Sequence, residues 1–274
     1  MNIAVDIGNT NLKCLVSVPH TDNEFYVWTI PPIIDRLDDF VSQHLLRWGA
    51  TTDTGKLMPS AHPQPITWHI IQTGKLHWQH LKKAILKIRP KDTFKLMTHR
   101  QIPLDINVKH PEKVGIDRLL AAFTAVQLHG DLPMLIVDAG TAITVDVVNE
   151  QIFCGGAILP GLTALSHVYP LISDKLPHVS IPAYPKSCDA IPPMFPGRNT
   201  EEALQSGLYW GTIGAIRQFY DIMVSKTKKT SVIITGGDAE YLLPGLFCVI
   251  PPKKIEHHYP LILEGINLLA RLKG

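Results

Sequence analysis

The sequence predicts an α/β protein built from two related halves. Two stretches, 3–16 and 135–148, each read as an apolar strand, an Asp-x-Gly turn and a second strand. Apolar residues at helical spacing follow between further strand-like runs. With 274 residues and an apolar fraction of 45%, the chain is long enough for one large or two ordinary domains with a full core.

The two Asp-x-Gly turns are the first candidates for a binding site. Asp6 and Asp138 each end an apolar run and are followed two residues later by a glycine, Gly8 or Gly140. Gly140 is expected to take the positive φ that a tight turn needs. Such turns direct backbone N–H and threonine hydroxyl groups towards one side, which favours phosphate binding. We therefore interpret Asp6 and Asp138 as corresponding points of a duplication.

The rest of the first half alternates helix and strand. Apolar spacing predicts an amphipathic helix over 35–48, a strand over 66–72 and a helix over 77–88. The segment 49–65 is polar and is expected to be a long loop. His77 and His80 share a helix face and could bind a metal, but with no third ligand nearby they read better as surface histidines.

Asp117 lies at the predicted start of an apolar helix over 119–128 that Gly130 closes. One interpretation is an N-cap aspartate, which alone would explain the residue type. The other is a carboxylate that the helix dipole keeps ionised and that points into a functional site. The spacing leaves both interpretations open.

The second half contains one further candidate for a helix cap. Thr200 precedes a predicted helix and could be its N-cap. Before that helix, 177–196 is proline-rich and predicted to be irregular. Strand 232–234 runs into Thr235-Gly236-Gly237-Asp238, where glycines allow either close ligand approach or an ordinary turn. A final helix over 261–272 is expected to dock on the second domain.

Composition excludes several classes of function. A net charge of +2 gives no electrostatic case for binding nucleic acid or a membrane surface. Neither a signal peptide nor a membrane-spanning run is apparent. The four cysteines are widely spaced and form no disulfide framework or CxxC pair, which favours a soluble protein of the reducing cytoplasm: Cys14, Cys154, Cys188 and Cys248.

Five motifs in order resemble the type III pantothenate kinases, and the match spans most of the chain. They are DIGNTNLK at 6–13, GIDR at 115–118, DAGTAITVD at 138–146, GGAILPGL at 155–162 and NTEEALQSGLYWG at 199–211. The resemblance implies two duplicated ribonuclease H-like (actin-like ATPase) domains, 1–114 and 115–274, with an ATP cleft between them. It also implies ATP-dependent phosphorylation of pantothenate to 4′-phosphopantothenate, the first step of coenzyme A biosynthesis, by a homodimer.

The resemblance also implies roles for individual residues. Asp117 would be the catalytic proton acceptor, and Asp138 would bind a monovalent cation, K⁺ or NH₄⁺. Pantothenate would contact Thr200 together with Gly115, Ile116, Asp117 and Arg118. ATP, with Mg²⁺ near Asp6, would contact Thr141 and the first hairpin, namely Asp6, Ile7, Gly8, Asn9, Thr10, Asn11, Leu12 and Lys13.

The sequence departs from the family at three places. Val108 stands where many members have a substrate-site tyrosine, Gln72-Thr73-Gly74 replaces a Ser-Val type segment, and the 49–65 loop is longer than usual. The main alternative function is a non-catalytic, ATP-binding accessory factor of the same family. Another kinase or phosphatase of the superfamily is a further alternative, against which the GIDR and NTEEA segments speak.

Overall fold

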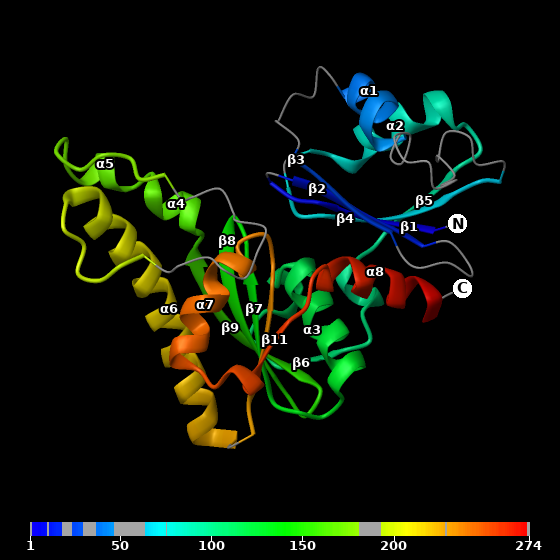
Figure 1. Ribbon diagram of the computed structural model, residues 1–274. Helices are drawn as coiled ribbons and strands as arrows, with labels where there is room; N and C mark the ends of the chain where they lie inside the picture. Colours follow the sequence, from blue (N-terminus) through cyan, green and yellow to red (C-terminus); the bar gives the residue numbers. More distant parts are fainter. Residues whose placement is uncertain are drawn as a thin grey trace. The chain divides into compact units, whose positions relative to one another are not determined.

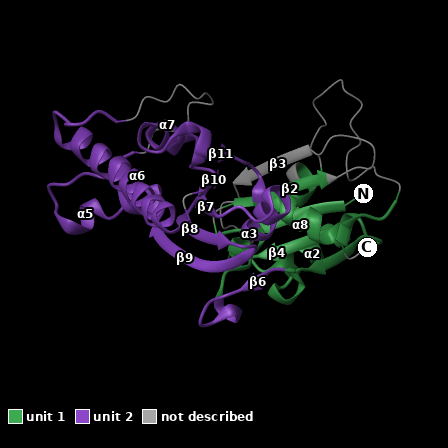
Figure 2. Ribbon diagram, turned by 90° about the horizontal axis from the view of Figure 1, so that it is seen from below, with its two compact units in different colours: residues 1–103, 114–120, 262–274 green, residues 104–113, 121–261 purple. Residues whose placement is uncertain are grey.

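The computed structural model describes residues 2–9, 11–17, 24–29, 37–46, 64–74, 76–180, 193–227 and 229–272 (Figure 1). Thr10 lies outside these residues, as does the predicted 49–65 loop apart from its last two residues. The described chain forms two compact units (Figure 2). Unit 1 comprises 1–103, 114–120 and 262–274, and unit 2 comprises 104–113 and 121–261.

Unit 1 is built on a mixed five-stranded sheet with the order β3-β2-β1-β4-β5. Its strands are β1 (Asn2–Ile7), β2 (Asn11–Ser17), β3 (Glu24–Thr29), β4 (Thr67–Gln72) and β5 (Thr93–Leu96). β1 pairs antiparallel with β2 and parallel with β4. The predicted strands at both ends of the first Asp-x-Gly turn and over 66–72 are therefore confirmed.

Helices α1 (Leu37–Phe40) and α2 (Trp78–Ile88) cover one face of this sheet (Figure 1). Leu81, Ala84 and Ile85 follow helical spacing on α2 and are buried against the alternate apolar residues of β1 and β4. The helix predicted over 35–48 is confirmed only in part, because α1 continues as a π-helix over Val41–Leu45. His77 is the N-cap of α2, where its Nδ1 accepts a hydrogen bond from the Gln79 N–H.

The C-terminal helix α8 (Leu261–Leu272) belongs to unit 1 from Ile262 onwards. The expectation that it docks on the second domain is thus wrong. Its apolar face is buried, with Leu263, Ile266 and Leu269 almost inaccessible to solvent, and helical periodicity alone does not say which sheet such a face will cover.

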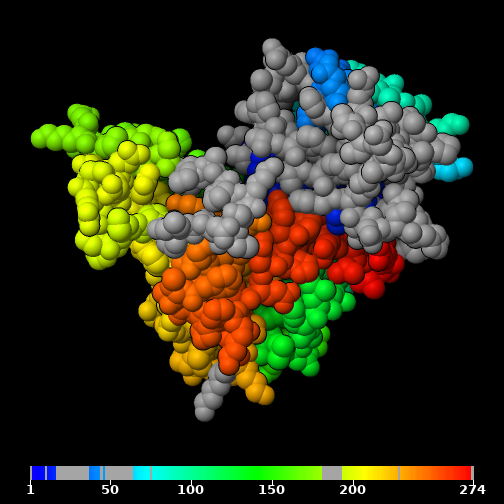
Figure 3. Space-filling model, in the orientation of Figure 1, coloured from blue at the N-terminus to red at the C-terminus, as the bar shows by residue number. Residues whose placement is uncertain are grey.

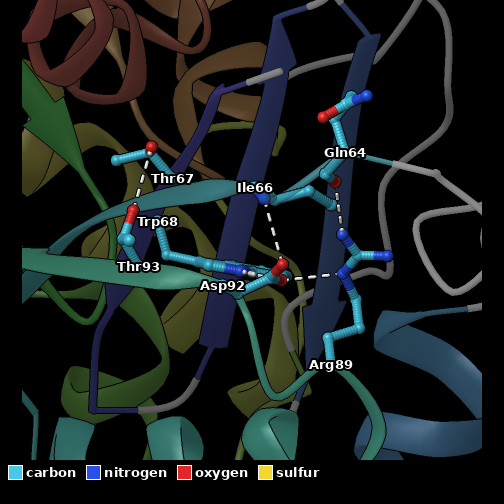
Figure 4. Close-up of polar contacts among 7 residues, drawn as sticks. All are labelled: Gln64, Ile66, Thr67, Trp68, Arg89, Asp92 and Thr93. Carbon is cyan, nitrogen blue, oxygen red and sulfur yellow. Dashed lines mark hydrogen bonds and ion pairs between the residues drawn. The ribbon is translucent and has the colours of Figure 1, made fainter.

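A buried polar cluster fixes the start of β4 to the loop after α2 (Figure 4). Asp92 accepts hydrogen bonds from the Ile66 N–H at 3.0 Å, from Trp68 Nε1 at 2.8 Å and from Arg89 Nε at 2.8 Å. Arg89 Nη2 donates to the Gln64 carbonyl at 2.8 Å. The Asp92 side chain is only 1% exposed, so these donors satisfy a carboxylate that burial would otherwise destabilise.

Unit 2 repeats the topology of unit 1 with one extra edge strand. Its sheet has the order β11-β10-β7-β8-β9-β6, and its strands are β6 (Asp105–Ile106), β7 (Met134–Ala139), β8 (Ala142–Asn149), β9 (Ile152–Pro160), β10 (Ser231–Thr235) and β11 (Ile255–His257). β7 pairs antiparallel with β8 and parallel with β10, as β1 does with β2 and β4. The common strand order supports the predicted duplication.

Helices pack on both faces of the unit 2 sheet (Figure 1). Alternate residues of β7, Leu135 and Val137, join a core with buried residues of α6 (Thr200–Thr227) and α7 (Ala239–Val249). α3 (Ile116–His129) lies on the other side of the sheet. The predicted end of α3 is confirmed, since Gly130 takes a φ of +64°.

The remaining elements of unit 2 are short, and they include α4 (Leu162–Ser166), α5 (Tyr169–Ile172) and a 3₁₀ turn over Pro252–Lys254. The described parts of 177–196 contain neither helix nor strand, as predicted, while 181–192 lie outside the described residues. No described helix is long and apolar enough to cross a membrane.

Candidate active site

The first Asp-x-Gly hairpin is held closed by its own backbone. Asp6 lies at the end of β1 opposite Lys13 of β2, and the Gly8 N–H donates to the Asn11 carbonyl at 3.0 Å. The Asp6 side chain is 6% exposed. An acidic and a basic side chain therefore flank the turn that was predicted to hold phosphates.

Not every residue of the first hairpin can offer its side chain to a ligand. Ile7 and Leu12 are 1% and 0% exposed and belong to the unit 1 core. Only their backbone groups can contact ATP, whereas Asn9 is exposed and Lys13 is half-buried. Burial, with the nearby Asp6 carboxylate as the second cause, raises the pKa of the Cys14 thiol.

Gly74, which follows β4, packs against the turn of this hairpin, a role that the sequence did not reveal. The N–H groups of Thr73 and Gly74 both donate to the Ile7 carbonyl, at 3.0 and 2.8 Å. A Cβ on Gly74 would lie 1.9 Å from the Gly8 carbonyl oxygen. Only glycine allows the chain after β4 to approach the turn this closely.

The second hairpin is clasped in the same way. Gly236, which has a φ of +96°, follows β10, and a Cβ there would lie 2.3 Å from the Ala139 carbonyl oxygen and 2.5 Å from Asp138 Oδ1. The Asp238 N–H donates to the Ala139 carbonyl at 2.8 Å. Thr-Gly therefore recurs after β4 and β10, a repeat that could have identified both glycines. Asp138 is half-buried and Thr141 is exposed.

The prediction that Gly140 needs a positive φ is wrong. Gly140 does not take a positive φ, and a Cβ there would meet only the Ala142 carbonyl oxygen, at 3.8 Å. The tight packing falls instead on Gly161, whose Cβ would lie 2.3 Å from the Gly140 carbonyl oxygen. Glycine is needed at 161 because the chain after β9 passes very close to the backbone of the turn at Gly140 and Thr141.

Asp117 is the second residue of α3, so the N-cap interpretation is wrong. Its Oδ1 accepts a hydrogen bond from the backbone N–H of Arg118 at 3.0 Å. A Cβ on Gly115 would lie 2.4 Å from this same Oδ1, so glycine at 115 makes room for the carboxylate.

The GIDR segment is also anchored from outside. His99 Nε2 lies 2.6 Å from the Val114 carbonyl oxygen, one residue before Gly115, a contact that the sequence did not predict. Ile116 is 6% exposed and packs inwards, so its side chain does not face a substrate. Asp117 and Arg118 are half-buried.

Thr200 is the first residue of α6 and is exposed, so it is not the cap. Asn199 caps the helix instead: its Oδ1 accepts from the Glu202 N–H at 2.9 Å, and its Nδ2 donates to Glu202 Oε1 at 2.9 Å. The Arg198 N–H donates to Glu202 Oε2 at 2.7 Å. The hydroxyl of Thr200 is thereby left for another role.

The described residues contain no group of three or more His, Cys, Asp or Glu side chains that could hold a metal ion. Each Asp-x-Gly turn instead presents one carboxylate, that of Asp6 or Asp138. Single carboxylates suit cations that complete their coordination with water, phosphate oxygens or carbonyl groups, as Mg²⁺ and K⁺ do. His77 and His80 are both exposed, in agreement with the surface interpretation.

Two sheets of the same mixed strand order give this chain the two-domain actin-like fold. Solved structures with this fold include a Baf-family protein from Campylobacter jejuni, with a TM-score of 0.54, 22% identity and coverage of 99% of this chain and 98% of that one. MreB5 of Spiroplasma citri has a TM-score of 0.50 at 8% identity, covering 99% and 96%. These likenesses show the fold alone.

Among proteins of that fold, the chain belongs to the type III pantothenate kinase family, whose sequence model matches residues 2–221. It is 37% identical to a type III pantothenate kinase of Persephonella marina, with 67% of each chain covered. It is also 37% identical to one from Gluconobacter oxydans, over 98% of this chain and 93% of that one. The predicted family, fold class and kinase activity are thereby confirmed.

Proposed function

We propose that this protein uses ATP to phosphorylate the 4′-hydroxyl of pantothenate, which is the first step of coenzyme A biosynthesis. The observation that carries the proposal is the family match, which extends over residues 2–221 and includes both hairpins, the GIDR segment and the start of α6. The duplicated sheets supply the two hairpins that a kinase of this fold needs.

Asp117 is proposed as the proton acceptor. Its Oδ1 is engaged by the Arg118 N–H, so Oδ2 is the atom that would meet the pantothenate hydroxyl. Phosphoryl transfer passes through a loose transition state, so a base chiefly orients the attacking hydroxyl and accepts its proton late. A carboxylate held by a backbone N–H in a first helical turn is suited to that task.

Arg118 and Thr200 are proposed to bind pantothenate, together with the backbone of Gly115 and Ile116. A guanidinium can pair bidentately with the pantothenate carboxylate. The exposure of Thr200, with capping taken over by Asn199, supports a substrate contact for its hydroxyl. Val108, which stands where many family members have a substrate-site tyrosine, packs near Gly155, where an added Cβ would lie 3.3 Å from Val108 Cγ1.

The phosphates of ATP are proposed to contact the first hairpin, 6–13, and Thr141 of the second. The family implies a divalent metal with ATP, and we assign Mg²⁺ to the neighbourhood of Asp6 and K⁺ or NH₄⁺ to Asp138. When bound, these cations offset repulsion between the carboxylates and the triphosphate.

A homodimer is part of the proposal. Unit 2 exposes large apolar side chains on α5 and just before α6, which is typical of a surface that a partner covers: Leu171 is 84%, Ile172 66%, Met194 63% and Phe195 80% exposed. Leu171→Glu is expected to shift the mass measured by light scattering from dimer to monomer. A cytoplasmic location also stays a prediction, from the widely spaced cysteines.

The test is detection of 4′-phosphopantothenate by mass spectrometry after incubation with pantothenate and Mg²⁺-ATP, with either K⁺ or Na⁺ present. Product in K⁺ and much less in Na⁺ is expected. ATP binding without product under every condition would favour the non-catalytic accessory factor. In Asp138→Ala, the preference for K⁺ should disappear, and an unchanged preference would put the cation elsewhere.

A further inference from the structure

A second pocket lies in unit 2, away from the candidate active site. It has a volume of about 230 Å³, and we call it the β11 pocket because β11 and the turn before it form one side. The residues that matter for its chemistry are His129 at the end of α3, Ser231 at the start of β10, and Lys253, Lys254 and Glu256. Figure 3 shows this face, where the orange-red segment around β11 adjoins the green segment around the end of α3.

The β11 pocket is separate from the residues proposed for catalysis. His129 follows Asp117 by twelve residues on one continuous helix, which corresponds to about 18 Å at the helical rise of 1.5 Å per residue. Met134, which also lines the pocket, begins β7, and Asp138 lies near the other end of that strand. The corresponding distance along β7 is about 13 Å.

Basic groups dominate the pocket. Lys253 and Lys254 face one acidic residue, Glu256. Glu256 Oε1 lies 3.5 Å from His129 Nε2 and 3.5 Å from His258 Nδ1, so two imidazoles already share the carboxylate. The two ammonium groups remain the main charges available to a ligand, which makes the pocket suited to an anion.

The histidine of the pocket is turned to the Glu256 carboxylate. His129 Nε2 is shielded from solvent and makes no hydrogen bond with any residue in the described part of the chain. Its 3.5 Å contact with Glu256 Oε1 is an ion-pair distance rather than a good hydrogen bond. Because a ligand in the pocket cannot reach an atom that water does not reach, His129 contributes by holding the Glu256 carboxylate, which leaves the lysines to meet an anion.

The size and the donors indicate the kind of anion. A volume of about 230 Å³ lies below the roughly 300–1,000 Å³ of typical small-molecule pockets, which favours a small anion. Lysine binds phosphate as a point charge, and two lysines line the pocket. The two ammonium groups and the Ser231 hydroxyl come from two separate segments, the turn before β11 and the start of β10.

We propose that the β11 pocket binds a small phosphate-type anion, either inorganic phosphate or a compact phosphate monoester. Lys253 and Lys254 supply the charge, and the Ser231 hydroxyl supplies a hydrogen bond. This site is independent of the kinase reaction proposed above.

The test is isothermal titration calorimetry of the full chain with inorganic phosphate at fixed ionic strength. The double variant Lys253→Gln/Lys254→Gln should weaken binding at least tenfold. Lys109→Gln/Lys175→Gln, which removes the same charge from two exposed lysines of unit 2, should leave the Kd unchanged. Glu256→Gln should tighten binding, because it removes the only carboxylate that lines the pocket.

Equal phosphate affinity in the wild type and in Lys253→Gln/Lys254→Gln would overturn the proposal, as would the absence of binding to the wild type. Malonate that binds as tightly as phosphate would overturn the assignment to a phosphate-type anion. Glycerol phosphate, titrated in parallel, separates the two sources: binding tighter than phosphate supports a monoester, and weaker binding supports the free ion.

Discussion

Asp92→Asn tests whether the buried cluster around β4 stabilises unit 1. The carboxylate accepts three hydrogen bonds, two at Oδ2 and one at Oδ1. Asparagine keeps the size but has one acceptor oxygen, so its amide group must face either the Ile66 N–H or the donors of Trp68 and Arg89. In both orientations a buried donor loses its acceptor, and the 8% exposed Arg89 side chain loses its counter-charge.

The expected cost follows from this burial. Removing one partner of a buried ion pair costs about 3–5 kcal/mol, a large part of the roughly 5–15 kcal/mol that stabilises a domain. For a protein of this size the change corresponds to a fall in Tm of about 6–20 °C. Urea unfolding followed by tryptophan fluorescence measures the free energy, and Trp68 reports from within the cluster.

Asp38→Asn is the matched control. Asp38 pairs with Lys87 of α2, and the two side chains are 58% and 53% exposed. An exposed ion pair contributes about 0–1 kcal/mol, so this variant should unfold almost like the wild type. A loss of less than 1 kcal/mol in Asp92→Asn, equal to that in Asp38→Asn, would refute the reasoning.

Three further predictions concern the site and its surroundings. Gly74→Ala should weaken ATP binding and lower the free energy of unfolding by about 1–3 kcal/mol, since its Cβ meets backbone atoms. Gly237→Ala, with open space around it, should change neither quantity. Urea unfolding and the KM for ATP measure the two effects. Burial lowers the pKa of His69. The contribution of neutral His69 to stability is therefore complete above about pH 6.5 and is lost as the pH falls through the lowered pKa. Between pH 7.5 and 5, His69→Gln should lose less stability than the wild type, and an equal loss would contradict this. Asn199→Ala should cost about 0.5–2 kcal/mol, while Thr200→Ala should keep its Tm and raise the KM for pantothenate.

The sequence predicted the sheets well because their signals are local. Apolar runs identified β1, β2, β7 and β8, and the repeated Asp-x-Gly turns indicated the duplication that the common strand order supports. Both ends of α3 were predicted to within a few residues, because Asp117 lies near the start of the helix and Gly130 follows its end.

What the sequence did not reveal depends on contacts between distant residues. Asp92 meets Ile66 and Trp68 across more than twenty positions, and no local pattern records that pairing. The need for glycine at position 74 comes from the Gly8 carbonyl in the turn of the first hairpin, far away in the sequence. The cap of α6 was assigned one residue late, because Asn199 and Thr200 are both good caps and only geometry separates them.

The measurement that tests the central claim most directly compares product formation by the wild type and Asp117→Asn. The amide keeps the size and can still accept the Arg118 N–H, so the variant should fold and bind ATP with unchanged affinity. Formation of 4′-phosphopantothenate by the wild type, with kcat at least a hundredfold lower in Asp117→Asn, is the predicted result. No product from the wild type would contradict the kinase assignment, and near-normal kcat in the variant would contradict the role of Asp117.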